Sequence, residues 1–428
     1  MNKSSPQSEL LTRIKTVEPL LNAVAIFIMA TMFLFWDASR AVYVLFSLAA
    51  LGFIIKYRPR MPTDHRFYSW PIIIFVVATC LSLLFNGISD SGINRVVSRY
   101  SLLLIAIPLV YVFYFSFNNK RNIWIKFVAG CLVMGGIALY DIFVLGEVRA
   151  GGGYNPAQFG FTALAMTSLV IASYHRFCQS KYGRVVYFLA ILMGVCAMIL
   201  SGTRTSWLAG FVVLVIALFF YLDRYSIPRR LLISLLLLGG VVIAGGSVPS
   251  VQKRVDSLID NLAPYVKGEE QTEFNSLRYR VEAWKAGWQI GMENKLFGVG
   301  PGNIKGAIDD YAEQNPQVAA LAGLNHIHNQ FLQTFAMSGL VGLFSLLVLM
   351  ASHLCLFAKY LGKRYSTEVR SLALAGFLLL VVYVIKSIPG VPFYGKHYLM
   401  MYAFASAAIW GALLGALRDS GLADNDID

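Results

Sequence analysis

A histidine at the junction of a polar and an apolar segment is the first residue of this chain that suggests chemistry. The pattern HN-x9-GxxG runs from His328 through Asn329 to Gly339 and Gly342. An imidazole has an ordinary pKa of about 6.5, so it can serve as a neutral base near physiological pH. His328 is therefore a candidate catalytic base at a membrane surface, and His326, in the same NHIHN stretch, is a second candidate.

The two glycines of this pattern are expected on the helix face below the histidine. If a helix begins near His328, Gly339 and Gly342 follow after nearly whole turns, and Gly339 lies about 16 Å deeper. Small residues on such a face have two interpretations. They allow a neighbouring helix to approach closely, or they leave a groove for a lipid chain.

An arginine occurs on the apolar side of a predicted amphipathic helix over residues 275–290. The apolar stripe has 3.6-residue spacing and consists of Leu277, Val281, Trp284 and Trp288. Arg280 belongs to this stripe, whereas Arg278 and Lys285 lie to its side. Arg280 either extends its charge to the headgroup level or holds an anion, because a guanidinium suits phosphate.

A second arginine, Arg204, stands in the tight turn SGTRTS, and the spacing R-x3-L leads from it to Leu208. It is either a topological anchor or a second cation of the same site. The glycine-rich stretch LFGVGPGN, residues 296–303, lacks the preceding strand and the following GK[ST] of a phosphate-binding loop. It predicts instead a turn that closes the amphipathic helix.

The composition determines which elements position these residues. The chain has 428 residues, 57% of them hydrophobic and 14% charged, and the mean hydropathy is +0.62. This apolar surface exceeds one soluble core and comes in blocks about one bilayer long, which predicts an all-α polytopic membrane protein. We expect about twelve spans, at residues 20–36, 41–55, 70–85, 102–117, 127–145, 159–174, 185–200, 206–222, 231–248, 331–357, 372–385 and 398–417.

Lysine and arginine predict the orientation of these spans. With a cytoplasmic N-terminus, 21 basic residues fall on the inner side and 7 in the short outer loops. The outer seven are Arg40, Arg95, Arg99, Arg149, Arg204, Lys386 and Lys396. The chain then divides into a cytoplasmic N-terminus (1–19), helices 1–9 (20–248), one large outer loop (249–330), helices 10–12 (331–417) and a cytoplasmic tail (418–428). No cleavable signal pattern occurs at the start, so the first span is expected to remain as an anchor.

Other site classes find little support. The net charge of +13 follows from topology and anionic headgroups, and no basic run with interleaved aromatics indicates nucleic acid. The five cysteines form no CxxC pair, and the acids of the outer loop form no metal-binding motif. We therefore expect no metal and no cofactor.

Taken in this order along the chain, these motifs resemble those of the O-antigen ligases (the WaaL family). This family belongs to a wider group with the O-antigen polymerases and the O-oligosaccharyltransferases. The resemblance rests on the twelve-span plan, the large outer loop between the ninth and tenth helices, R-x3-L at Arg204, R-x3-W at Arg280, LFGVGPGN and HN-x9-GxxG at His328.

The resemblance implies a GT-C-like, metal-independent, inverting glycosyltransferase of the bacterial inner membrane, with its active site on the periplasmic side. Such a ligase transfers O-antigen polysaccharide from undecaprenyl pyrophosphate to a sugar hydroxyl of lipid A-core. His328 would be the general base, and Arg204 and Arg280 would hold the pyrophosphate. Further substrate-binding candidates are Arg278, Lys386, Lys396, Arg99, Trp284, Gly339 and Gly342.

Three alternatives stay open at this point. A polymerase typically has two sizeable periplasmic loops, and a protein O-oligosaccharyltransferase an extended C-terminal region, whereas one large loop and a short tail are expected here. A transporter of lipid or polysaccharide would place ionisable residues at mid-membrane depth, and Asp141 is the best candidate for one. Substrate flux without glycosyl transfer would indicate that class.

Overall fold

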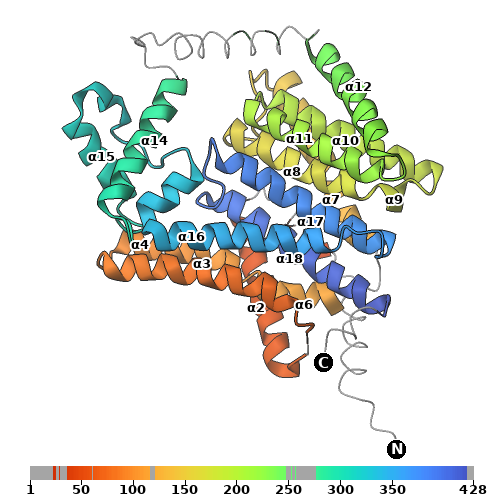
Figure 1. Ribbon diagram of the computed structural model, residues 1–428, viewed down its shortest axis with the longest axis horizontal. Helices are drawn as coiled ribbons and strands as arrows, with labels where there is room; N and C mark the ends of the chain where they lie inside the picture. Colours follow the sequence, from red (N-terminus) through yellow and green to blue (C-terminus); the bar gives the residue numbers. More distant parts are fainter. Residues whose placement is uncertain are drawn as a thin grey trace, which may run out of the picture.

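The computed structural model describes residues 23–25, 28, 36–59, 61–115, 121–246, 252, 256 and 276–421, and within them every regular element is a helix. The predicted N-terminal segment, nearly all of the first span, most of residues 247–275 and the end of the tail lie outside this description. In Figure 1 the long helices run side by side, and α14 and α15 lie at the left end.

The bounds of the helices follow the apolar blocks of the sequence. In chain order they are α2 (Trp36–Tyr57), α3 (His65–Phe85), α4 (Asp90–Arg95), η1 (Val96–Tyr100), α5 (Ser101–Leu104), α6 (Ile107–Phe115), α7 (Arg121–Phe143), α8 (Pro156–Ala172), α9 (Tyr174–Phe177), α10 (Lys181–Leu200), α11 (Arg204–Tyr221), α12 (Ile227–Gly246), α14 (Ser276–Glu293), α15 (Ile304–Gln314), η2 (Pro316–Leu321), α16 (Gln330–Lys359), α17 (Thr367–Ser387) and α18 (Lys396–Asp419).

The predicted membrane class is confirmed. Within the described residues, nine helices are long and apolar enough to cross a membrane, and α8 is a shorter apolar helix. Each predicted span from 41–55 onward coincides with a helix or a run of helices, most of which begin a few residues earlier than predicted. Hydropathy detects the apolar part of a helix, whereas the helix itself continues into polar flanks. The total of twelve spans stays a prediction.

The predicted start of one span is wrong, and the error concerns two arginines that were assigned to a loop. The sequence placed a span at 102–117, but helical structure begins at Asp90, and the candidate span runs over Asp90–Phe115. Ser89 caps the start of α4 by accepting a hydrogen bond from the Gly92 N–H at 3.2 Å, and η1 is a π-helical turn. Arg95 and Arg99, expected in an outer loop, therefore lie on this helix.

The amphipathic helix exists as α14, but its buried face is not the predicted stripe. Ala283, Ala286 and Ile290 are buried, whereas Trp288 is 56% exposed. A Cβ on Gly287 would lie 2.6 Å from Ile327 and one on Gly291 2.3 Å from Phe335. Small residues let α14 approach its neighbours closely, so the packed face is centred on them, while Trp284 packs against the core only in part.

Helix α16 is interrupted at Gly339, where φ is 65° and ψ is −162°. The two halves are joined by the glycine-rich stretch, whose Val299 and Gly300 N–H groups donate to the carbonyls of Ala336 and Met337, both at 2.9 Å. The Leu340 N–H donates to the carbonyl of Lys295 at 2.7 Å. These bonds replace those that a continuous helix would make, because buried backbone groups need partners.

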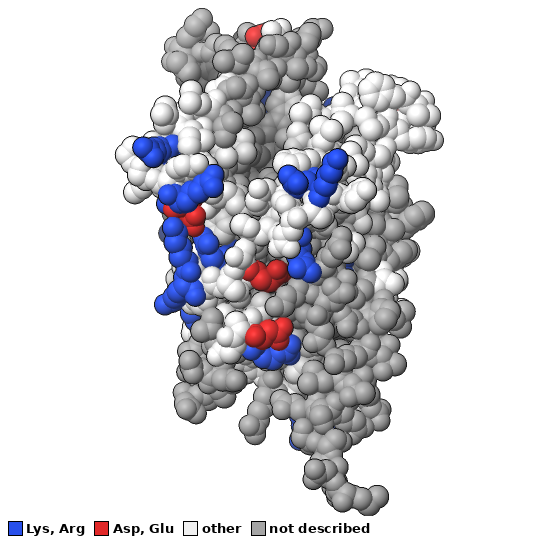
Figure 2. All heavy atoms as spheres, turned by 90° about the vertical axis from the view of Figure 1, so that its right-hand side faces the viewer, with Lys and Arg blue, Asp and Glu red and all other residues white. Residues whose placement is uncertain are grey.

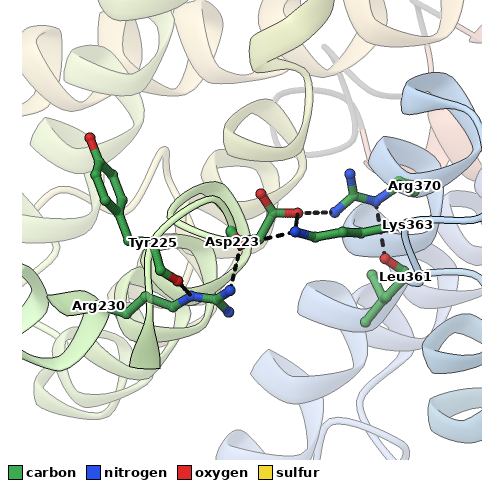
Figure 3. A network of polar contacts seen from close by, with 6 residues as sticks. All are labelled: Asp223, Tyr225, Arg230, Leu361, Lys363 and Arg370. Atoms are coloured by element: carbon green, nitrogen blue, oxygen red, sulfur yellow. Dashed lines mark hydrogen bonds and ion pairs between the residues drawn. The ribbon is translucent and has the colours of Figure 1, made fainter. Parts of the chain in front are cut away.

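The opposite end of the bundle carries a charged network. This end, which we call the basic end, is formed by the 222–226 loop and the 360–366 turn, and Figure 2 shows Lys and Arg gathered on it. Asp223 accepts a hydrogen bond from Arg370 Nη2 at 2.7 Å, and its carbonyl accepts from Lys363 at 3.0 Å and from Arg230 (Figure 3). Several helix ends of the predicted inner side are thereby joined.

Replacing Gly339 by Ala should destabilise the protein. The backbone conformation at this position is one that essentially only glycine adopts, which costs other residues about 1–3 kcal/mol. A Cβ there would also lie 2.2 Å from the carbonyl oxygen of Leu296. We expect a lower melting temperature of the detergent-purified protein. Gly136→Ala is the matched control, because a Cβ at this helical glycine meets nothing within 4 Å. Equal melting temperatures for both variants would contradict the account of the break.

Candidate active site

His328 lies immediately before α16 in a left-handed backbone conformation, with φ of 57°. The next residue, Asn329, caps the helix: its side-chain oxygen accepts hydrogen bonds from the N–H groups of Phe331 and Leu332 at 2.9 and 3.0 Å. An asparagine cap satisfies N–H groups that have no partner within the helix. The HN pair of the motif is thus a histidine held at a helix start by its neighbour.

Two side chains hold the histidine segment, and a third holds the loop between α17 and α18 against α16. The indole N–H of Trp284 donates to the carbonyl of His328 at 3.2 Å, so the tryptophan of R-x3-W contacts the histidine segment. Gln333 accepts from the Ile327 N–H, and Gln330 from the Phe393 N–H, both at 2.8 Å. Sequence reasoning missed both glutamines. The presence of two amide side chains within the first turns of an otherwise apolar helix could have indicated them.

The surroundings of His328 favour the neutral form of its imidazole. Its ring centroid lies 4.2 Å from that of His326 and 6.1 Å from that of Tyr279. Burial lowers the pKa of His328 to about 3, with further contributions from His326, Arg280 and Lys386. Burial, together with Arg99 and Lys386, also lowers the pKa of His326. A neutral imidazole can accept a proton, which is what a general base requires.

The structure brings the two predicted arginines together. Arg204 is the first residue of α11 and Arg280 lies on α14. Burial lowers the pKa of Arg280, and the positive charge of Arg204 lowers it further. The turn before Arg204 is held by Arg149, whose Nε donates to the carbonyl of Ser201 at 2.8 Å. Arg204 thus acts on Arg280, and Arg280 in turn acts on His328.

Two more predicted cations reach this end. Lys386 lies in the last turn of α17 and is 8% exposed, with Nζ 5.9 Å from the ring centroids of Phe161 and Tyr398. The Arg99 Nη1 donates to the carbonyl of Tyr394 at 2.9 Å. Arg278 on α14 and Lys396 at the start of α18 are not among the charges that act on the two histidines.

The glycines of HN-x9-GxxG do not form the continuous face that the spacing predicted. The break at Gly339 ends the first helical half, and its surface is covered by the backbone of Leu296. An apolar groove of about 560 Å³ lies nearby between α3 and α16. Leu340, Val341 and Phe344 line it, but neither glycine is among its lining residues.

The charged side chains around the two histidines are positive. Within the described part of the chain, no carboxylate forms an ion pair with Arg99, Arg280 or Lys386. The same residues contain no group of three or more His, Cys, Asp or Glu that could hold a metal ion. Half-buried cations without carboxylates favour an anionic ligand, because such a ligand offsets both their mutual repulsion and the cost of burial.

Asp141, the residue that motivated the transporter alternative, has a structural role. It lies near the end of α7, and its Oδ2 accepts hydrogen bonds from the N–H groups of Gly151 and Gly152 at 2.8 and 2.7 Å. These bonds hold the loop between α7 and α8. A carboxylate that is occupied by two backbone amides near a helix end is no indication of a transport pathway.

The lowered pKa of His328 predicts a pH dependence of stability. Because the folded pKa is about 3, below the ordinary 6.5, the unfolded chain binds more protons between these values. The stability is therefore full above about pH 6.5 and falls as the pH falls toward 3. His328→Phe keeps a ring but removes this contribution, so its melting temperature should fall less between pH 7.5 and pH 5. Parallel curves for the two proteins would refute the assignment.

Comparison with known proteins agrees with this geometry. Residues 188–347 match the family model described as O-antigen ligase, a stretch that contains Arg204, Arg280, His328 and both glycines. A protein of Haemophilus influenzae described as uncharacterized is 22% identical over 346 residues, which cover 79% of this chain and 84% of that protein. The resemblance predicted from the motifs is thereby confirmed: the match to the O-antigen ligase model runs from α10 across the break at Gly339 into the second half of α16.

Proposed function

We propose that this protein is an O-antigen ligase that transfers polysaccharide from undecaprenyl pyrophosphate to a sugar hydroxyl of lipid A-core. The observation that carries the proposal is a neutral histidine surrounded by cations, with Arg280 and Lys386 acting directly on His328. This arrangement provides a base for a hydroxyl and a place for a polyanionic leaving group. The match to the O-antigen ligase model includes both His328 and the two arginines Arg204 and Arg280.

The proposed reaction is one displacement. His328 accepts the proton of the acceptor hydroxyl while the hydroxyl oxygen attacks the anomeric carbon of the donor sugar. The bond between that carbon and the pyrophosphate oxygen breaks, and undecaprenyl pyrophosphate leaves with the electron pair. Arg204 and Arg280 stabilise the charge on the leaving group, since fixed cations in a poorly solvated site act strongly on developing charge. Attack opposite the leaving group inverts the anomeric configuration.

The surrounding cations also regulate the base. In the free protein, Arg280 and Lys386 contribute to the low pKa of His328. A bound pyrophosphate would neutralise these charges and raise the pKa of His328 toward its ordinary value. Donor binding would therefore make His328 a stronger base. In the empty site, its low pKa limits proton uptake.

The orientation supports a periplasmic reaction. The basic end carries the 222–226 loop and the 360–366 turn, and the histidine lies at the other end of α16. Basic residues concentrate on the cytoplasmic side of inner-membrane proteins. We therefore propose that the site opens to the periplasm, with both chain termini in the cytoplasm.

Removing the base or a clamp arginine should abolish capping of lipopolysaccharide. We expect His328→Ala to lower kcat about 10²–10⁴-fold and Arg280→Ala about 10²–10³-fold. Both should reach normal membrane levels. Lys305→Gln is the charge-matched control, because Lys305 pairs with Asp309 on the surface of α15. The measurement is transfer from a defined undecaprenyl-linked donor to purified lipid A-core. Normal capping by both site variants would end the proposal, and donor-to-donor elongation by the wild type would identify a polymerase.

Transfer should proceed without a divalent metal ion. The cations of the proposed clamp are side chains, so pyrophosphate does not require a metal to balance its charge. We expect the rate for the purified protein to be unchanged by a chelator titration. Loss of activity that returns on addition of a divalent ion would overturn this expectation.

A further inference from the structure

A second pair of arginines lies at Tyr394, whose hydroxyl contacts the segment that carries the two histidines. Arg95 and Arg99 are one turn apart where α4 passes into η1, and their guanidinium carbons lie 5.0 and 4.3 Å from the ring centroid of Tyr394. Arg99 also donates to the Tyr394 carbonyl at 2.9 Å. Two guanidinium groups are thus held at one aromatic ring, and a π-turn of the kind often found at functional sites presents them.

This pair is incompletely satisfied. The Nη1 of Arg95 is buried and makes no hydrogen bond, and no carboxylate of the described residues forms an ion pair with Arg95 or Arg99. Asp90 lies on the same helix but is exposed. Two adjacent cations and a buried donor without an acceptor carry a free-energy cost that a phosphate oxygen would relieve.

The pair is attached to the other histidine of the site. Tyr394 donates through its hydroxyl to the carbonyl of Asn325 at 3.4 Å, and Asn325 directly precedes His326. The charge of Arg99 acts on His326, whereas that of Arg280 acts on His328. One arginine of each pair thus acts on a different histidine, whereas Lys386 acts on both.

The displacement mechanism determines what each pair faces. The leaving group and the attacking hydroxyl lie on opposite sides of the anomeric carbon. With the donor pyrophosphate at Arg204 and Arg280, the base lies between that clamp and the acceptor. In this arrangement the pair linked through Tyr394 to the His326 segment would face the acceptor.

We propose that Arg95, Arg99 and the ring of Tyr394 form a second anion subsite, which binds a phosphate group of the acceptor glycolipid. The proposal rests on the proposed function in one respect, that an acceptor hydroxyl reacts beside His328. The subsite positions the acceptor and takes no part in bond breaking. It also explains why two arginines lie within a helix that hydropathy would have ended before them.

Acceptor binding without donor tests the subsite directly. Purified protein in detergent is titrated with phosphorylated lipid A-core and with the same glycolipid after its phosphates are removed. Arg95→Gln combined with Arg99→Gln should weaken binding of the phosphorylated acceptor about tenfold or more, since each loses charge-assisted hydrogen bonds. Binding of the dephosphorylated acceptor should change less than about twofold, as should binding of the undecaprenyl-linked donor. Lys305→Gln is the control for loss of one positive charge.

Two further variants guard against misfolding. Arg95→Lys with Arg99→Lys keeps the charge but loses the fork geometry, and should give intermediate affinity. Tyr394→Leu removes the ring at which both guanidinium groups are held, and should also weaken binding of the phosphorylated acceptor. All variants are compared by melting temperature before titration.

The outcomes separate the subsite from the proposed function. Weakened donor binding with unchanged acceptor binding would assign the pair to the donor clamp and overturn the proposal. An equal loss for phosphorylated and dephosphorylated acceptors would show a merely structural role and also overturn it. Phosphate-dependent acceptor binding without any transfer by the wild type would support the subsite while the proposed function fails. Transfer by the wild type, with acceptor binding unchanged in the variants, would support the proposed function and overturn the subsite.

Discussion

The pairing of buried backbone groups at the break in α16 is the constraint on which the site depends. A helix interrupted inside the bundle leaves N–H and C=O groups without partners, and water is scarce there. The glycine-rich stretch supplies those partners through Val299, Gly300 and Lys295. Because this stretch directly follows α14, the same contacts hold the helix with Arg280 and Trp284 against the one that begins after His328. Ser82 strengthens the junction by donating to the carbonyls of Phe297 and Met337 at 2.6 and 2.9 Å.

The second constraint is charge. Cations from η1, α14 and α17 act on the two histidines, and Arg204 of α11 acts on Arg280 of α14. Such an arrangement is unfavourable in an empty site, and its free energy improves when an anion binds. The mutual repulsion of these cations therefore favours binding of an anionic ligand. Where carboxylates are present, as with Asp223 and Asp64 at the basic end, they are paired with cations and join helix ends. In the described part of the chain, cations of the basic end pair with carboxylates and join helices, whereas Arg99, Arg280 and Lys386 form no ion pair with a carboxylate.

The motifs gave the candidate residues of the site, and the structure shows which of them interact. His328, Arg204 and Arg280 were chosen from type and spacing; in the structure Arg204 acts on Arg280, and Arg280 acts on His328. Gln330 and Gln333 were missed, because a polar residue in an apolar run gives no sign of which backbone group it will meet. Arg95 was assigned to a loop, since two arginines lower the hydropathy of a helix that continues through them. The predicted apolar stripe of α14 did not show that the helix packs mainly through alanine and glycine, which approach a neighbouring helix more closely than indole rings allow.

The sequence by itself determined the membrane class, the position of most helices, the charge asymmetry between the two ends and the residue types of the site. These properties are local, because each depends on residues close together in the sequence and not on contacts between distant segments. Only the tertiary structure decided that Gly339 breaks its helix, that the glycine-rich stretch fills the break and that a second arginine pair meets Tyr394. These features arise where segments far apart in the chain share backbone hydrogen bonds or a single ring, and their free energy depends on which surfaces meet.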